Sequence, residues 1–321
     1  MDPWCAETSR ERAEPLVATA SRVERWLLVE HTGAWGPESV PSGRMPLEAA
    51  RALARTAADA GARLLLLRRP QGVPCGPGRW VYAVDSRPGS EVVRARQVGD
   101  DAELEHLAPP YAGPAEGWTV VDEPLLLVCT HGRHDRCCAL RGRPVAAALA
   151  ARHPSTTWEC SHVGGDRFAA NLLVLPDGLY FGRVEADEVL ALADALADGE
   201  LAVDRLRGRS SLSMPAQAAQ HFARARLGRS RREDLAVTGQ QGAGADRWRV
   251  HLAGTPGRPA VQVVVRYDRS GDGAAQVLTC GAGEAKRAPV FRLVELVVDG
   301  PAGDGAAAAQ ASASPAVSST A

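Results

Sequence analysis

Two stretches of the sequence share the same pattern, a short apolar run followed by a polar segment that contains glycine. Residues 125–138 read Leu-Leu-Leu-Val-Cys-Thr-His-Gly-Arg-His-Asp-Arg-Cys-Cys, and residues 158–168 read Trp-Glu-Cys-Ser-His-Val-Gly-Gly-Asp-Arg-Phe. An apolar run of this length that stops at glycine and polar residues is typical of a buried strand. Thiols and imidazoles in two loops at the ends of two strands predict a metal or redox site.

Composition limits the partners and the compartment. The chain of 321 residues is 45% apolar and 23% charged, which is ordinary for a globular protein of two or three domains. Its net charge of −1 gives no overall field that would attract nucleic acid or an anionic membrane. No run approaches the roughly 18 apolar residues of a membrane span, and the N-terminus lacks the apolar core of a signal peptide. Seven cysteines, two of them adjacent, fit cytoplasmic thiols or metal ligands better than a secreted disulfide framework.

Two segments share one order of predicted elements: strand, helix, strand, hairpin, helix. In the first these are residues 25–30, 46–60, 63–68, 80–96 and 101–107, and in the second residues 125–129, 144–151, 156–160, 172–183 and 187–196. This is the core order of a thioredoxin-like layer. We interpret it as a degenerate duplication in which only the second copy kept thiols in its loops. The competing interpretation is that any two α/β units look alike at this level.

The rest of the chain is predicted to form a small α+β module and a tail. Residues 1–20 are expected to be a mobile start, and residues 204–211 a polar connector. An amphipathic helix over 215–227 is followed by alternating strands at 247–252, 260–267, 276–280 and 290–298. Residues 301–321 are almost entirely Ala, Ser, Gly and Pro, which predicts disorder.

The two loops carry a long pattern that resembles a known family. Cys129-Thr-His-Gly-x-x-Asp-x-Cys-Cys138 and Ser161-His-Val-Gly-Gly-Asp-Arg-Phe-Ala-Ala-Asn171 are similar to the sucrase/ferredoxin-like family, a group of thioredoxin-fold 2Fe-2S ferredoxins. Tyr180-Phe-Gly-Arg and Arg207-Gly-Arg-Ser extend the likeness over residues 20–298. Despite the family's name, no paired-carboxylate site is evident, so no glycosidase activity is expected.

The resemblance implies an α/β fold in four parts. A degenerate thioredoxin-like half spans residues 1–112, and a thioredoxin-like ferredoxin domain with the cluster loops spans residues 113–204. The α+β module then occupies residues 205–300, before the tail of residues 301–321.

The resemblance also implies a ligand set. Relatives hold the cluster with two cysteines and with the histidines of His-x-Gly-Gly-His, which correspond by position to Cys129, Cys138, His162 and Asp166. Asp166 departs from the pattern, and a carboxylate is a harder ligand than imidazole or thiolate. Three outcomes stay open: Asp166 ligates, which position favours; Cys160 or Cys137 takes the fourth place; or the cluster is absent or labile.

Other residues of the loops are expected to support the site. The adjacent Gly164 and Gly165 let the backbone fold closely around a cofactor. We expect His131 and His134 to support the ligands, Phe168 and Asn171 to frame the site, and Arg133, Asp135 and Arg167 to form ion pairs. Cys137 is expected to point away from Cys138, and Cys5, Cys75 and Cys280 to be unliganded thiols.

The function expected is that of an electron carrier rather than a stand-alone catalyst. A 2Fe-2S centre would pass single electrons to or from a redox partner protein or reductase. One alternative is a thiol-based oxidoreductase that uses Cys129 or the Cys137–Cys138 pair, although the Cys-x-x-Cys at a helix start is missing. Another is a structural zinc site of Cys129, Cys138, Cys160 and His162, whose spacing is longer than in typical zinc modules. The last alternative is a binding module without redox activity.

Overall fold

The first predicted unit forms half of a large sheet. The computed structural model describes residues 4–37, 45–73, 76–113, 115–269, 275–288 and 290–299. The elements of this unit are β1 (Arg25–Glu30), α2 (Leu47–Asp59), β2 (Ala62–Arg68), β3 (Arg79–Asp85), β4 (Val92–Val98) and the 3-10 helix η1 (Asp101–His106). β1 pairs in parallel with β2 and antiparallel with β3, so the strand order is β2-β1-β3-β4. The short β5 (Thr119–Val121) extends the edge beside β4.

The second unit repeats this arrangement. Its elements are β6 (Leu125–Cys129), α3 (Arg136–Arg152), β7 (Thr157–Cys160), the 3-10 helix η2 (Asp166–Phe168), β8 (Leu172–Leu175), β9 (Leu179–Phe181) and α4 (Val189–Ala197). β6 pairs in parallel with β7 and antiparallel with β8, so the order β7-β6-β8-β9 matches that of the first unit. Both units therefore have the predicted strand–helix–strand and hairpin order.

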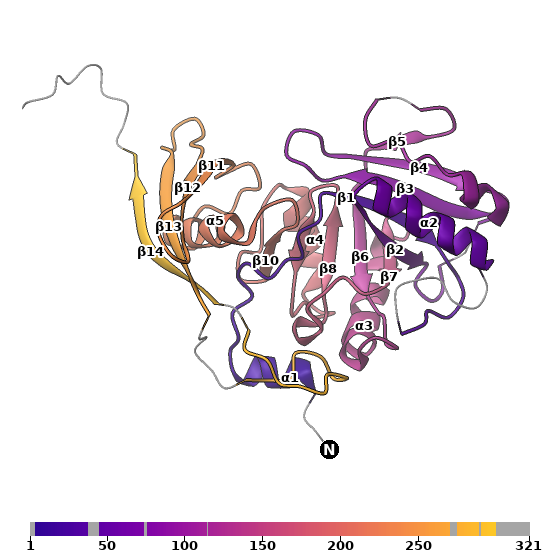
Figure 1. The fold of residues 1–321 in the computed structure, drawn as a ribbon, viewed down its shortest axis with the longest axis horizontal. Coiled ribbons are helices and arrows are strands. Elements are labelled where there is room, and N and C mark those ends of the chain that lie inside the picture. The colour runs from indigo at the N-terminus through magenta and orange to yellow at the C-terminus, as the bar shows by residue number, and fades with distance from the viewer. Residues whose placement is uncertain are drawn as a thin grey trace, which may run out of the picture.

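The two units join edge to edge into one sheet. β2 pairs antiparallel with β7, and β10 (Leu206–Arg209) adds the far edge beside β9, which gives ten strands (Figure 1). α3 and α4 bury Val145, Leu149 and Leu192 on one face of the second unit. On the opposite face, side chains of both units, including Trp26, Tyr82 and Trp158, form one apolar cluster. The mixed α/β class is confirmed.

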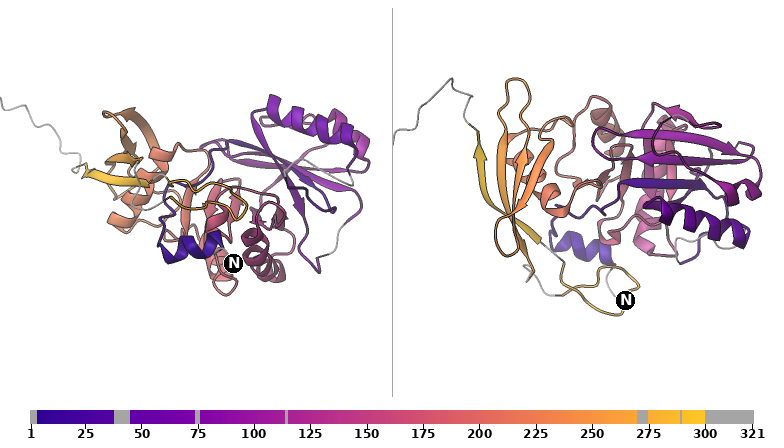
Figure 2. Two further views of the ribbon diagram at one scale, coloured as in Figure 1. Left: turned by 60° about the horizontal axis from the view of Figure 1, so that its bottom comes forward. Right: turned by 45° about the horizontal axis from the view of Figure 1, so that its top comes forward.

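The C-terminal part is the predicted α+β module. α5 (Met214–Leu227) packs on an antiparallel sheet of β11 (Val237–Gly242), β12 (Arg247–Leu252), β13 (Val261–Asp268) and β14 (Val290–Val298), in that order. The Ser213 side chain accepts a hydrogen bond from the backbone N–H of Ala216, and Gly228 ends the helix in the left-handed region. Figure 2 shows the module beside the ten-stranded sheet.

Several sequence predictions were wrong. Residues 5–11 form a helix, α1 (Cys5–Glu11), that buries Cys5, Ala6 and Ser9, where a mobile start was expected. The predicted connector contains β10, in which Leu206, Arg207 and Gly208 are all buried beside β9. Residues 276–280 form bends with one isolated bridge, from Gln276 to Lys286, and no strand. The glycines of β11 concealed that strand in the sequence.

The start of α3 was also misplaced. Gly142 and Pro144 predicted a helix that begins at residue 144, but α3 begins at Arg136 and contains Pro144. The true start is set by Asp135, whose side chain accepts a hydrogen bond of 2.8 Å from the backbone N–H of Cys137. Cys137 and Cys138 consequently lie in the first helical turn.

The division into domains stays a prediction, and the large sheet crosses its boundaries through β5 and β10. The predicted tail and Cys75 lie outside the described residues. Within the described ranges, no helix is long and apolar enough to cross a membrane.

Candidate metal centre

The ends of β6 and β7 place the two cysteine-bearing loops next to each other. The strands are parallel and adjacent, with Cys129 opposite Cys160, so both loops leave from the same edge of the sheet. α3 returns close to this edge, because a Cβ atom at Gly142 would lie 2.2 Å from the carbonyl oxygen of Cys129. Glycine at this position lets the first turn of α3 bring Cys138 beside Cys129.

The four predicted ligands come together. The sulfurs of Cys129 and Cys138 and a ring nitrogen of His162 all lie within 4.8 Å of one another. Asp166 Oδ1 lies 3.1 Å from Cys138 Sγ and 2.9 Å from His162 Nδ1. Cys129, Cys138 and Asp166 are buried, and His162 is partly exposed. The sequence-derived set therefore lies in two overlapping groups of donor atoms, Cys129, Cys138 and His162 in one and His134, His162 and Asp166 in the other.

Cys160, the alternative fourth ligand, lies apart from both groups. It is fully buried and packs in the apolar cluster that includes Trp158 and Leu67. Among the described residues, it belongs to none of the groups of metal-ligand side chains that gather within 4.8 Å. Its packing is that of a small core side chain.

The loop that carries His162 and Asp166 depends on two glycines and on a buried arginine. Gly164 and Gly165 have φ angles of +96° and +80°, which L side chains rarely adopt. A Cβ atom at Gly165 would also lie 2.3 Å from Nη2 of Arg207. The predicted need for glycine at this position therefore has two causes, backbone conformation and the guanidinium beneath the loop.

Arg207 supports this loop from below and was missed as a site residue. Its Nη1 donates to the carbonyl of Gly164 at 2.9 Å and to Asn171 Oδ1 at 2.8 Å, and its Nη2 donates to the carbonyl of Thr19 at 2.5 Å. Asn171 Nδ2 in turn donates to the carbonyl of Gly165. Asn171 thus frames the site as predicted. The one signal for Arg207 in the sequence was its place in the Arg207-Gly-Arg-Ser motif.

Two further histidines contact the candidate ligands. The buried His131 accepts a hydrogen bond at Nδ1 from the backbone N–H of His162, so its Nε2 carries the proton and donates to the carbonyl of Gly36 at 2.6 Å. His134 stacks on His162 with ring centroids 3.7 Å apart, and its Nε2 lies 3.6 Å from Asp166 Oδ2. Both histidines therefore support the predicted ligands.

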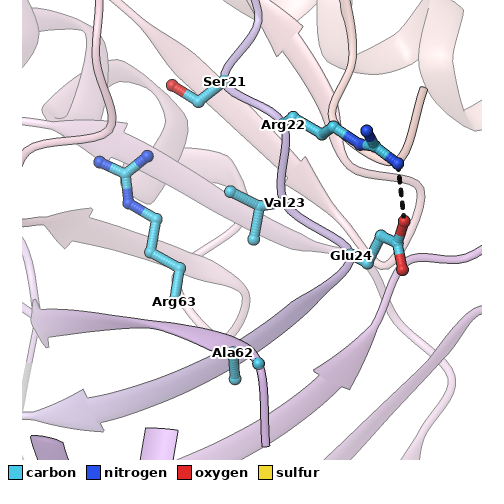
Figure 3. A pocket seen from close by; sticks show the side chains of 7 residues that line it. Ser21, Arg22, Val23, Glu24, Ala62 and Arg63 are labelled. Carbon is cyan, nitrogen blue, oxygen red and sulfur yellow. Dashed lines mark ion pairs between the residues drawn. The ribbon is translucent and has the colours of Figure 1, made fainter. Parts of the chain in front are cut away.

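The back of the His162 loop lies against the first unit. Arg63 donates to the carbonyl of His162 at 2.7 Å, and both Arg63 and Ser21 donate to the carbonyl of Val163. Arg63 and Ser21 also line a cavity of about 510 Å³, on whose other side Arg22 and Glu24 form an ion pair (Figure 3). These bonds fix the backbone on both sides of the candidate centre.

The charges in the cluster favour a thiolate beside an imidazolium. A hydrogen bond from Cys138 and the neighbouring His162 hold the pKa of Cys129 well below its usual range despite burial. Burial alone would lower the pKa of His162, but Asp166 and Cys129 outweigh it and raise this pKa to about 9. Burial opposes ionisation of Asp166, but His162 lowers the pKa of its carboxyl. Cys129 and burial raise the pKa of Cys138.

This donor set fits a metal ion or cluster. Two sulfurs, an imidazole and a carboxylate are the ligand types of thiolate-rich metal sites. Nδ1 of His162 is buried 2.9 Å from Asp166 Oδ1, and the contact is a charge pair rather than an aligned hydrogen bond. A metal ion at this point would offset the negative charge of the buried thiolate and carboxylate.

Cys137, Cys5 and Cys280 form a separate group. Cys137 points away from Cys138, as predicted, and its sulfur lies 3.7 Å from that of Cys5 and 3.5 Å from that of Cys280. Cys5 and Cys280, which were expected to be unliganded thiols, therefore contact Cys137 and each other. Asp135, expected in an ion pair, caps α3 and also contacts Cys5 and Cys280, whereas Arg167 pairs with Glu14 as predicted.

Comparisons with other proteins give the family. No curated protein matches the sequence. Among solved structures, a cysteine-to-serine variant of the thioredoxin-like 2Fe-2S ferredoxin from Aquifex aeolicus is 19% identical, with a TM-score of 0.23, and the match covers 26% of this chain and 97% of that one. The model of the sucrase/ferredoxin-like family matches residues 16–208. The chain therefore belongs to the sucrase/ferredoxin-like family.

Proposed function

We propose that the protein binds a 2Fe-2S cluster through Cys129, Cys138, His162 and Asp166 and carries single electrons. The observation that carries this proposal is the grouping of donor atoms of Cys129, Cys138 and His162 within 4.8 Å of one another, with Asp166 in contact with Cys138 and His162. Membership of the sucrase/ferredoxin-like family supports the choice of cluster over other metal groups. Such a cluster supplies one-electron chemistry when bound.

The chain contributes burial, ligand type and a route for protons. Cys129 and Cys138 are at most 1% exposed, so their sulfurs are shielded from water. The side chain of His162 is 18% exposed and that of His134 34% exposed, so the paired rings connect the site to solvent. His162 can hold or release a proton at the ring nitrogen that does not ligate, which couples its charge to that of the site.

The exposed edge of the two stacked rings is also where we expect a redox partner protein or reductase to dock. His134 and His162 are the members of the site's histidine and ligand set that reach the surface. The partner's docking there would shorten the distance to the buried sulfurs.

The test is an iron and acid-labile sulfide assay on anaerobically purified protein, with electron paramagnetic resonance of the reduced form. We expect about two irons and two sulfides per chain, in line with the cluster type. Asp166→Ala should lower this content, whereas Asp187→Ala, a change at an exposed aspartate, should leave it unchanged. Colourless, iron-free protein from anaerobic preparation would refute the proposal.

A single zinc ion at the same donors is the second candidate. Metal–sulfur bonds of ~2.3 Å place the ligand atoms of a tetrahedral ion ~3.8 Å apart. The donors of Cys129, Cys138 and His162 lie within 4.8 Å of one another, which is near that spacing. Zinc without iron or sulfide would favour this candidate.

A thiol-based oxidoreductase has less support. The pKa of Cys129 is lowered, first by the hydrogen bond from Cys138, as a reactive thiol requires, but the side chain is 1% exposed and substrates cannot reach it.

A further inference from the structure

Three cysteines from distant parts of the chain meet at the N-terminal end of α3. Cys5 lies in α1, Cys137 in the first turn of α3, and Cys280 in the segment 275–288. In Figure 1, α1 and this segment lie close together at the bottom of the molecule, near α3. More than 130 residues separate each cysteine from the next, so the fold alone brings them together.

The three sulfurs form a nearly equilateral triangle. The Cys5–Cys137 distance is 3.7 Å, and the Cys137–Cys280 and Cys5–Cys280 distances are both 3.5 Å. Zinc–sulfur bonds of ~2.3 Å at a tetrahedral angle place two sulfurs ~3.8 Å apart. The triangle therefore has nearly the dimensions of one face of a tetrahedral zinc site.

Asp135 supplies the fourth corner. Its Oδ2 lies 3.4 Å from Cys5 Sγ, and all four donor atoms lie within 4.8 Å of one another. A carboxylate oxygen at ~2.0 Å and a sulfur at ~2.3 Å from one tetrahedral ion are ~3.5 Å apart. Oδ1 of Asp135 is used separately, because it accepts the capping hydrogen bond from the Cys137 N–H. The carboxylate can thus cap α3 and ligate at once.

We propose that Cys5, Cys137, Cys280 and Asp135 bind one zinc ion in a structural site, separate from the Cys129 site. Four protein ligands close the coordination sphere, which is the arrangement of structural zinc. The ion would hold α1 and the segment 275–288 against the first turn of α3. Since Cys138 is the next residue after Cys137, the same turn would be fixed for the Cys129 site.

The site has an entry path for the ion. A cavity of about 730 Å³ opens beside it and is lined by Trp4, Cys5, Asp135 and Cys280, among others. Cys280 is exposed, whereas Cys5 and Cys137 are buried. A zinc ion or a chelator can therefore reach the sulfurs without unfolding of the chain.

A disulfide is the main alternative use of these thiols. It would join two of the three sulfurs and leave the third beside the buried carboxylate of Asp135. One zinc ion instead engages all three sulfurs and offsets the negative charge of the carboxylate.

The test measures zinc by mass spectrometry in the full-length protein, purified in zinc-containing medium without chelators, for the wild type, Cys280→Ser and Cys129→Ser. We expect the Cys280→Ser variant, which lacks one of the three thiolate ligands, to hold one zinc fewer per chain than the wild type. Its iron and sulfide content should stay at the wild-type level, while Cys129→Ser keeps this zinc and loses the iron. The two proposals can therefore fail independently.

Cobalt substitution gives a second readout. Replacement of the zinc with Co²⁺ should give intense thiolate-to-cobalt bands in the wild type and weaker bands in Cys280→Ser. Because Cys280 is exposed, its replacement should leave the circular dichroism unchanged. Equal zinc content in the wild type, Cys280→Ser and Cys5→Ser would overturn the inference, as would a wild type that holds a disulfide and no zinc at these cysteines.

Discussion

Replacement of Arg207 with methionine tests whether the buried guanidinium holds the loop of the candidate centre. Arg207 is 1% exposed and donates to four acceptors, the carbonyl and hydroxyl oxygens of Thr19, the carbonyl of Gly164 and Oδ1 of Asn171. Methionine fills a similar volume but donates no hydrogen bond, so these acceptors lose their partner. A buried acceptor left unsatisfied costs about 1–3 kcal/mol. Burial lowers the pKa of Arg207 to about 10 and so disfavours its charged form. Removal of this buried charge therefore offsets part of the loss of stability caused by the unsatisfied acceptors.

We therefore expect Arg207→Met to lower the free energy of unfolding by about 4 kcal/mol. Arg209→Met is the matched control, since it lies two residues away on β10 and its partner Glu91 is partly exposed. A pair of this kind contributes about 1 kcal/mol or less. Urea unfolding of the metal-free proteins measures both changes, and iron content reports on the loop.

The reasoning fails if the two variants lose similar stability, or if Arg207→Met keeps full iron content. The first outcome would mean that the orphaned acceptors find water or new donors at little cost. The second would mean that the Gly164 loop keeps its conformation without the guanidinium.

Two other changes test the site. In metal-free protein, the His162 pKa of about 9 exceeds its ordinary value of 6.5, so pairing with Asp166 stabilises the fold fully below pH 6.5 and this contribution is lost as pH rises through 9. Asp166 and Cys129 share this shift, so Asp166→Asn should cost more at pH 6 than at pH 10 in urea unfolding, by part of the roughly 3 kcal/mol that the shift represents. Equal costs at the two pH values would contradict the pairing. Gly142→Ala should destabilise the folded protein by about 3 kcal/mol and lower its iron content, because the new Cβ would lie 2.2 Å from the Cys129 carbonyl oxygen. A variant with the melting temperature and iron content of the wild type would contradict this close approach.

The convergence of the predicted ligands was accessible to sequence analysis because it follows from strand geometry. β6 and β7 are short apolar runs that could be recognised directly, and β6 was predicted at its exact bounds. Parallel neighbouring strands end at one edge, so Cys129 and His162 had to approach each other. The position of Cys138 was less certain, because the helix start depends on the capping side chain of Asp135 rather than on Gly142 or Pro144.

The Cys5–Cys137–Cys280 group could not be predicted in the same way. Its members are brought together by α1 and by the irregular segment 275–288, and neither has a periodic pattern that fixes its place against α3. Arg207 was hidden for a related reason. A charged residue in a four-residue edge strand resembles a solvated connector, and only the packing of β10 against β9 shows that its side chain lies inside.

The first unit supports the loops of the second unit that carry the candidate ligands. In the duplicated order, the loop after β1 corresponds to the loop after β6, and the two loops contact each other. The Nε2–H of His131 donates a hydrogen bond to the carbonyl of Gly36. The other ring nitrogen of His131, Nδ1, accepts a hydrogen bond from the backbone N–H of His162. From β2, Arg63 donates to the carbonyl of His162. These bonds come from the loop after β1 and from the start of β2. The candidate centre is thus a property of the joined sheet, since neither unit alone supplies both the donor atoms and the groups that orient them.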